Sequence, residues 1–596
     1  MVNLKKLFSR PLPSTRGGVF YNTFPYQTKI SPEAIAVYIA ALTNPGDTVL
    51  DTFGGSGSTS IAALLCEHPT DYMKGLALDL GVKPNWGARN AISYELGTYA
   101  SFAARTMMNR LRANDYCAAV DDFLDKAERL LGSSYVARDP QGGTGQIRYV
   151  IWSEVLRCPR CGLEFSYFDV GIRRSPVVFL EMLKCPHCDK ITKVDACPVV
   201  TEEYFDRLIG KLCKRKRRIP VWVYGQTGKW KWDRKADKTD LGLLKKIEGL
   251  DFDQDDEPRE VQWGDLWRSG YHFGITHLHH FYTKRNYLAM YKLWRLASTY
   301  GGRVSDALHL LLLSYNATHC TLMTRVVAKK NSKDFILTGS QSGVLYVSRL
   351  PVEKNVLLGL KRKAKHFAEA YAVLEECTGR VLVHNETSER LRERSGSVDY
   401  VFTDPPFGDF IPYAEVNQIN ELWLPSVTDR RRELIISSSQ GKDVGRYGQM
   451  LTSVFSEIGR VVKRNGFATV VFHAAKADVW NAFASSVSTA GMRILQTSIL
   501  DKKQASFKQV VSADSVQGDP MLLLRKSEQG RVNRSLSSVD VLEEVISKSK
   551  SSTLSDERRI YSAYVNACLK YGVKVEYDAK TAYRLIESKI GVRNRA

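Results

Sequence analysis

A glycine-rich turn between a short apolar strand and a helix constrains the fold more than any other feature of this sequence. Residues 48–51 (TVLD) are expected to form a buried strand, and residues 59–66 a helix. Between them, Gly55 and Gly57 let the backbone approach a ligand closely, and the helix begins with unpaired amide groups. This arrangement is typical of the first unit of a Rossmann-like nucleotide-binding sheet, so we predict an α/β fold.

A ribose-bearing ligand at this turn needs an acidic residue at the end of the next strand, where a carboxylate can accept hydrogen bonds from the ribose hydroxyl groups. Two residues are candidates: Asp79, which ends residues 75–79, and Glu95, which ends residues 91–95. Glu95 is favoured because a helix is expected to begin directly after it. The residues before it would then include an insertion.

Residues 404–407, Asp-Pro-Pro-Phe, form a second candidate site after a predicted strand at residues 397–403. Two adjacent prolines stiffen this loop and remove amide donors that would compete for its carbonyl oxygens. The carboxylate of Asp404 and the carbonyl of Pro405 can then each accept one hydrogen from an amino group on a flat ring. This frees the lone pair of the amine for attack, while Phe407 can stack on the ring.

The elements after this loop favour a catalytic role over a simple tight turn. We expect a helix at residues 451–462, a turn at 463–466, a strand at 467–472, a helix from about residue 477 and a last strand at 515–525. This alternation predicts the second half of a Rossmann-like sheet.

Four of the eleven cysteines form two Cys-x-x-Cys pairs, Cys158 with Cys161 and Cys185 with Cys188. This spacing is typical of a zinc ribbon, in which four thiolates close a tetrahedron around one ion. We therefore expect a structural zinc site with no position for a substrate. Disulfides are the alternative, and the reducing compartment expected for this chain disfavours them. His187 lies inside the second pair and is not expected to be a ligand.

Basic residues outnumber acidic residues by 85 to 64, which gives a net charge of +21. This excess favours a nucleic acid partner, because basic side chains release counterions from a phosphate backbone. The basic runs at residues 211–218 and 229–238 coincide with aromatic residues that can stack on bases or pack in a core: Trp222, Tyr224, Trp230 and Trp232. Each run alone is equally consistent with a solvated face.

Residues 271–294 contain a group of histidines that suggests a second metal site: His272, His277, His279 and His280. We do not expect one, because no carboxylate or cysteine lies at ligand spacing in this segment. A helix is expected to begin near Thr283, and an apolar helix at about residues 305–324 is expected to resume the core.

Together these motifs resemble the class I, S-adenosylmethionine-dependent amino-methyltransferases that act on DNA. They are most similar to large adenine-specific DNA methylases with an internal zinc ribbon. The similarity covers most of residues 15–525 and has the order of the alpha group, in which the recognition insert lies between the cofactor loop and the catalytic loop. It rests on these segments: PYQTKISPEAI, NPGDTVLDTFGGSGST, YELGTYASFAART, WSEVLRCPRCG, CPHCD, FYTKRN, TDPPFGDFIPY and GRVVKRNGF.

The resemblance implies a role for each matching residue. Contact with S-adenosylmethionine is implied for Thr28 and Lys29 in a loop that closes over it, for Asp51, Phe53, Gly55 and Gly57, and for Glu95 at the ribose. Catalysis is implied for Asp404, Pro405, Pro406 and Phe407. Phe407 stands where tyrosine is more frequent, and stacking needs the ring but not the hydroxyl.

At 596 residues the chain is too long for one ordinary core. The implied fold is a Rossmann-like methyltransferase sheet split by an insert, with a helical C-terminal appendage. Residues 1–145 would form the cofactor-binding half and residues 146–300 the inserted zinc ribbon and target-recognition region. Residues 301–530 would form the catalytic half, and residues 531–596 a linker and the helical appendage.

The predicted function is methyl transfer from S-adenosylmethionine to the exocyclic amine of a base flipped out of double-stranded DNA, with adenine N6 as the favoured target. The alternatives are cytosine N4, a base in structured RNA, and a non-catalytic DNA-recognition subunit, which the two intact loops disfavour. A nuclease or other defence-system partner, as in restriction–modification, stays open. The chain has neither an apolar run of 18 residues nor the apolar stretch of a secretory signal, so a soluble, cytoplasmic protein without a membrane span is expected.

Overall fold

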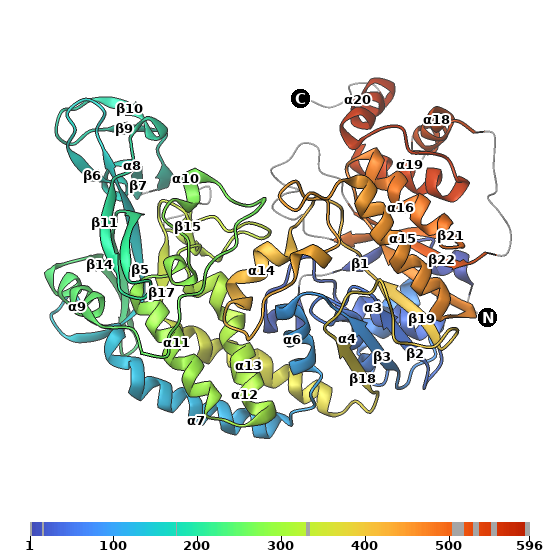
Figure 1. The fold of residues 1–596 in the computed structure, drawn as a ribbon, viewed down its shortest axis with the longest axis horizontal. Coiled ribbons are helices and arrows are strands. Elements are labelled where there is room, and N and C mark those ends of the chain that lie inside the picture. The colour runs from blue at the N-terminus through green and yellow to red at the C-terminus, as the bar shows by residue number, and fades with distance from the viewer. Residues whose placement is uncertain are drawn as a thin grey trace.

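The computed structural model describes residues 3–14, 17–174, 176–328, 334–502, 518–527, 536–549 and 557–590. Two larger β-sheets organise these residues, one toward each side of the molecule, with long helices between them (Figure 1). Among the described helices, none is long and apolar enough to cross a membrane.

The first sheet has eight strands within these ranges, in the spatial order β18-β3-β2-β19-β20-β22-β21-β1. Neighbouring strands run parallel except at β22, which is antiparallel to both β20 and β21. A mostly parallel sheet whose strands alternate with helices is an α/β architecture, as predicted. The bounds are β1 (Leu12–Ser14), β2 (Thr48–Asp51), β3 (Asn90–Tyr94), β18 (Val381–His384), β19 (Val398–Thr403), β20 (Val462–Val471), β21 (Met492–Lys502) and β22 (Asp519–Lys526).

Helices alternate with these strands and cover them, so that β19 is buried over almost its whole length. One of these helices begins at Pro32, a first-turn position where a missing amide hydrogen costs nothing. The helices are α1 (Leu4–Leu7), α2 (Val19–Thr23), α3 (Pro32–Leu42), α4 (Ser58–Leu65), α5 (Asp71–Asp79), α6 (Thr98–Met107), α14 (Tyr413–Glu421), α15 (Val444–Val461) and α16 (Ala477–Thr489).

The order of the strands reverses between β2 and β19, which are parallel neighbours with Val49 opposite Tyr400. The chain continues from β2 to β3 on one side of this point, and from β19 to β20 on the other. Ligands of open α/β sheets bind at such a reversal, beyond the carboxyl ends of the strands. The glycine-rich turn follows β2 and the Asp404 loop follows β19, so the topology brings the two candidate sites to one edge.

The second sheet is antiparallel, and β5 is its central strand. It includes β17, which lies in the sequence well beyond residue 300, where the predicted insert ends. The strands are β4 (Val136–Arg138), β5 (Thr144–Arg157), β6 (Glu164–Ser166), β13 (Arg218–Thr227), β14 (Trp230–Lys235) and β17 (Val352–Lys354).

Within the described residues, four two-stranded pairs lie outside the larger sheets. They are β7 (Ile172–Arg174) with β8 (Val177–Phe179), β9 (Met182–Lys184) with β10 (Ile191–Lys193), β11 (Thr201–Asp206) with β12 (Lys211–Lys216), and β15 (Arg325–Val327) with β16 (Ile336–Thr338). The same region contains α8 (Tyr167–Gly171), α9 (Lys238–Gly249) and α10 (Ser269–His272). In Figure 1, β9, β10 and α8 lie near the tip of the left lobe.

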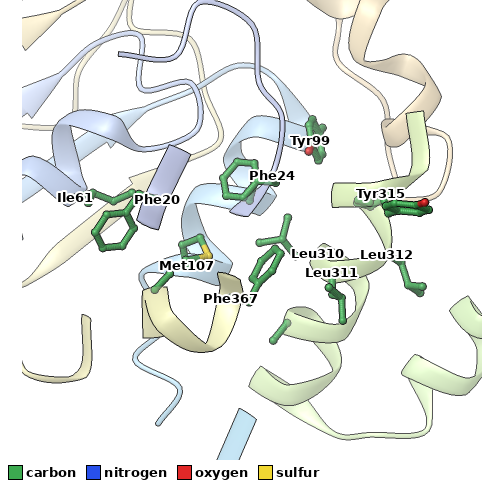
Figure 2. Close-up of a cluster of buried hydrophobic side chains, with 14 of the residues drawn as sticks. Phe20, Phe24, Ile61, Tyr99, Met107, Leu310, Leu311, Leu312, Tyr315 and Phe367 are labelled. Carbon is green, nitrogen blue, oxygen red and sulfur yellow. The ribbon is translucent and has the colours of Figure 1, made fainter. Parts of the chain in front are cut away.

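Long helices between the sheets give the two lobes a shared apolar core. Figure 2 shows Phe24, Tyr99 and Phe367 packed near Leu310 and Tyr315, so that side chains from the N-terminal segment meet those of the central helices. Burial of such rings and leucines contributes roughly 1.5–3 kcal/mol per side chain. The helices are α7 (Ala113–Leu131), α11 (Lys284–Ser298), α12 (Gly302–Tyr315), which continues as a π-helical turn (Asn316–Cys320), and α13 (Val356–Glu375).

The last described residues form helices that pack on the first sheet's outer side (Figure 1). They are α18 (Ser538–Ser549), α19 (Glu557–Tyr571) and α20 (Ala579–Ile590). Hydrogen bonds between Asn481 of α16 and the backbone of Val575 tie this region to the rest of the fold.

Candidate active site

Residues from both predicted loops line one cavity of about 120 Å³ at the carboxyl ends of β2 and β19. The cavity therefore brings together segments that lie far apart in the sequence. The predicted residues that line it are Thr28, Lys29, Asp51, Phe53, Gly55, Glu95, Asp404 and Pro406. Gly57 lies beside them at the N-cap of α4.

Glycine is required in the turn because the backbone bends sharply and passes close to its neighbours. Gly55 has φ +50°, and a Cβ atom there would lie 3.0 Å from the ring of Tyr26. Gly57 has φ +86°, which also favours glycine. At Gly54, a Cβ atom would overlap the hydroxyl group of Ser93 in β3.

Asp51 connects the two halves of the site. Its Oδ1 accepts hydrogen bonds from the backbone amide of Phe53, at 3.0 Å, and from the hydroxyl group of Thr403, at 2.8 Å. Thr403 is the last residue of β19 and directly precedes Asp404. Burial raises the pKa of Asp51, while these hydrogen bonds oppose the rise. The Asp51 side chain therefore fixes the position of one loop relative to the other.

Glu95 directly follows β3, as the favoured assignment requires. Its Oε2 accepts a hydrogen bond from the amide of Gly55 at 2.7 Å, and its Oε1 accepts one from the amide of Gly97 at 2.6 Å. Burial raises its pKa to about 7, although both hydrogen bonds favour the ionised form. The carboxylate thus lines the cavity and also holds the glycine-rich turn.

Asp79 occupies a different place from the one that a ribose ligand would need. Residues 75–79, considered as a strand end from the sequence, form the last turns of helix α5. Asp79 is exposed and does not line either of the cavities described here. The missed signal was Thr70, whose side chain accepts from the amide of Met73 and caps the start of this helix.

Residues 26–29 form a segment along the cavity that the sequence predicted as a closing loop. Thr28 has φ +57°, a conformation that β-branched residues rarely adopt, and its hydroxyl group lies 3.0 Å from that of Tyr413. Lys29 donates to the carbonyl of Phe20 at 2.6 Å, and burial lowers its pKa to about 7. Sequence reasoning assigned no role to Tyr26 or Tyr413, whose rings stack with centroids 6.1 Å apart.

The Asp404 loop lies between this cavity and a larger one of about 1490 Å³. Asp404 and Pro406 line the smaller cavity, whereas Phe407 lines the larger. The carbonyl of Pro406 accepts hydrogen bonds from the hydroxyl of Tyr447, at 2.5 Å, and from the amide of Gly408, at 3.0 Å. Residues 26–29 line both cavities, so the two cavities adjoin along this segment.

The four cysteines predicted to bind zinc converge in the second lobe. Their sulfur atoms all lie within 4.8 Å of one another, with Cys158 Sγ 3.7 Å from Cys188 Sγ and Cys161 Sγ 3.8 Å from Cys185 Sγ. A tetrahedron with Zn–S bonds of about 2.3 Å has edges of about 3.8 Å, so this donor set fits zinc. The His187 ring meets the carbonyl of Glu164 instead of joining the cluster.

A carboxylate from outside residues 271–294 accompanies the histidines of this segment, which the spacing within the segment could not indicate. Asp206, from β11, has its Oδ2 2.8 Å from Nε2 of both His279 and His280. The amides of Thr276 and His277 donate to Nδ1 of His280, so a neutral His280 carries its proton on Nε2 and donates it to Asp206. That nitrogen has no lone pair for a metal, and the geometry is that of a hydrogen-bonded cluster.

Most aromatic residues of the basic and aromatic stretch are more buried than a nucleic acid contact surface requires, whereas most of its lysines are exposed. Trp232 and Tyr224 are buried, and Trp222 packs against the guanidinium of Arg174, 3.7 Å from the ring centroid. Trp230 is 40% exposed and is the one of the four aromatic residues that remains available for stacking on a base.

The α/β sheet and the cavity at its switch point fit a methyltransferase fold. Residues 5–70, which contain the glycine-rich turn, match the family model N6_N4_Mtase, described as DNA methylase. This match confirms the predicted resemblance to S-adenosylmethionine-dependent DNA methyltransferases. No curated protein matches the chain. One similar solved structure is titled "Crystal Structure of antibiotic-resistance methyltransferase Kmr"; it is 14% identical, covers 28% of this chain and 73% of its own, and has a TM-score of 0.15, too low to carry an argument.

Proposed function

We propose that this protein transfers a methyl group from S-adenosylmethionine to the exocyclic amine of a base flipped out of DNA, with adenine N6 as the target. The observation that carries the proposal is the position of the Asp404 loop between two adjoining cavities. Asp404 and Pro406 line the smaller cavity with the glycine-rich turn, and Phe407 lines the larger cavity. In this position the loop would present an amine from one side to a methyl donor on the other.

The residues of the smaller cavity fit S-adenosylmethionine. The glycine-rich turn leaves room for a ligand close to the backbone, and Glu95 offers a buried carboxylate to the ribose hydroxyl groups. The segment with Thr28 and Lys29 would close over the ligand, held by the contact of Thr28 with Tyr413. Bound there, S-adenosylmethionine would supply an electrophilic methyl group.

The Asp404 loop activates the amine in this proposal. The Asp404 carboxylate and the Pro405 carbonyl each accept one amino hydrogen, which draws the nitrogen lone pair out of conjugation with the ring. Tyr447 and Gly408 hold the Pro406 carbonyl, so the loop keeps its shape when the base enters. Asp51 fixes the loop against the cofactor turn through Thr403.

The larger cavity receives the base and the neighbouring DNA. Its volume of about 1490 Å³ is greater than a single flipped base needs. Stacking on Phe407 is worth roughly 1–3 kcal/mol and offsets part of the few kcal/mol needed to extrude a base. The net charge of +21 supports a nucleic acid partner.

The second lobe would be the recognition region, with one structural zinc ion held by Cys158, Cys161, Cys185 and Cys188. A closed four-thiolate site stabilises its surroundings and leaves no position for a substrate. The exposed Trp230 is a candidate contact with DNA.

Expression in a host that lacks DNA methylation, followed by modification-sensitive sequencing of the host DNA, tests this function. We expect one modified adenine within a defined sequence. Modified cytosine N4 would change the target and keep the mechanism, because the loop chemistry is the same for both amines. Unmodified DNA together with methylated RNA would overturn the choice of substrate.

The same assay tests the role of Asp404. We expect Asp404→Ala to abolish methylation and to leave the Kd for S-adenosylmethionine within a few-fold, since the residue acts on the amine. Asp115→Ala, in an exposed ion pair with Arg112, is the matched control and should remain active. A collapse of cofactor affinity in Asp404→Ala would show that the role assigned to Asp404 is wrong.

A further inference from the structure

A buried histidine–aspartate pair lines the larger cavity and has no part in the mechanism given so far. His473 lies two residues after the end of β20, and Asp519 begins β22, its antiparallel neighbour. His473 Nδ1 lies 3.2 Å from Asp519 Oδ1, and the two side chains are 9% and 4% exposed. The amide of Phe472 donates to the carbonyl of Pro520 at 3.0 Å, which fixes this part of the sheet edge.

His473 lies against the ring that is proposed to stack on the base. Its imidazole centroid is 5.8 Å from that of Phe407 and 6.2 Å from that of Phe410. All three rings line the larger cavity together with Asp519. A flat ring in contact with Phe407 would therefore lie within reach of the histidine.

Burial of a polar pair of this kind is unfavourable compared with apolar side chains of the same volume. Removing two such groups from water costs several kcal/mol, and apolar side chains of similar volume often pack equally well or better. The position of the pair beside the base site gives a reason for its presence.

We propose that His473 contacts the ring edge of the flipped base and holds its amine toward Asp404; this inference rests on the proposed function. The Asp519 carboxylate, 3.2 Å from Nδ1, orients the imidazole and leaves Nε2 to meet the ligand. Nε2 then faces the ring nitrogen next to the amine-bearing carbon, an acceptor that an N–H group at Nε2 can satisfy. Adenine N1 and cytosine N3 both provide such an acceptor.

The test compares His473→Leu and His473→Gln with the native protein on a duplex that carries the mapped methylation site. Because the acceptor nitrogen of the base is left unpaired in a buried site, we expect His473→Leu to lower kcat/KM about 10- to 100-fold. His473→Gln should retain more activity, because its amide nitrogen lies near the position of Nε2. The Kd for S-adenosylmethionine should stay within about twofold in both variants. His366→Leu, the same change on α13 at a 37% exposed side chain, is the control and should behave as the native protein.

A second measurement separates base contact from a structural role. We expect His473→Leu to bind the duplex with an intact target base more weakly than the native protein, and to bind a duplex with an abasic target position equally well. Equal loss on both duplexes, or no loss on either, would overturn the inference. If the native protein methylates no DNA, both the proposed function and this inference fail. If the native protein is active and His473→Leu is equally active, only the inference fails.

Discussion

Replacement of Glu95 by glutamine tests the cofactor site most directly, because it removes one charge and leaves the side-chain shape almost unchanged. The native carboxylate accepts amide hydrogens from Gly55 and Gly97 through its two oxygens. Glutamine has one oxygen, so its NH2 group must face one of these amide donors or turn away from the cavity. The change therefore weakens both the turn and the acceptor offered to the ribose.

The expected magnitude follows from the loss of one charge-assisted hydrogen bond in a buried site. Such a bond is worth about 1.5–3 kcal/mol, so the Kd for S-adenosylmethionine should rise about 10- to 150-fold. Asp79→Asn, on the exposed end of α5, should change the Kd less than about twofold.

Binding of S-adenosylmethionine should also depend on pH through Glu95. Burial raises the pKa of this carboxyl to about 7, so the free protein holds a proton there at lower pH. A ligand that needs the carboxylate must displace this proton, and the Kd should rise about tenfold per pH unit below 7. Above pH 7 the contribution of Glu95 to the Kd should be constant, and Glu95→Gln should remove this contribution; Lys29, whose pKa is also about 7, contributes separately.

Isothermal titration calorimetry of the native protein and the two variants between pH 6 and about pH 8 measures all of these effects. The reasoning would be refuted if Asp79→Asn weakened binding as much as Glu95→Gln. An unchanged Kd in Glu95→Gln would equally show that Glu95 does not contact the ribose.

Two further predictions concern the zinc cluster and the closing segment. Metal analysis should find one zinc ion per chain, and Cys158→Ser should yield poorly soluble, zinc-depleted protein. His187→Ala should keep the metal, because the His187 ring contacts the Glu164 carbonyl and not the cluster. Metal-free protein of full thermal stability would contradict a structural zinc site. Tyr413→Phe removes the hydrogen bond between Thr28 and the hydroxyl of Tyr413. The loss of one neutral hydrogen bond should increase the rate of S-adenosylmethionine release about 2- to 10-fold in stopped-flow measurements. An unchanged rate would show that this contact does not hold the segment closed.

The sequence predicted the local elements of the first sheet well, because each carries a signal within a few residues. Pro32 in a first turn and the glycines after β2 indicate where elements begin and end. The strand predicted at 467–472 is observed, but β20 begins earlier, at Val462, and includes the residues predicted as a turn. Val462 lies opposite Val398 and Phe467 lies opposite Tyr400, so residues 463–466 form a bulge between two paired positions of β20.

Contacts between distant segments were harder to predict, because the pattern of one segment does not encode its partner. Nothing near His279 in the sequence indicates that its side chain contacts Asp206, which lies at the end of strand β11. Similarly, the Asp-Pro-Pro-Phe motif does not show that Phe407 faces a different cavity from Asp404, or that His473 lies beside it. These relations depend on strand order, which the structure supplies.

The hydrogen bond between Thr403 and Asp51 has a consequence for how the chain folds and how it can vary. The two residues are 352 positions apart, so one edge of β2 stays unpaired until β19 has been synthesised. Such distant pairing slows folding, and the cofactor half alone would leave a buried strand exposed. The cost of closing the loop rises by only about 0.6 kcal/mol for each doubling of its length. Insertions in the exposed loops of the intervening lobe would therefore add little to the cost of loop closure, while the shared apolar core and the two loops that meet at β2 and β19 keep their positions.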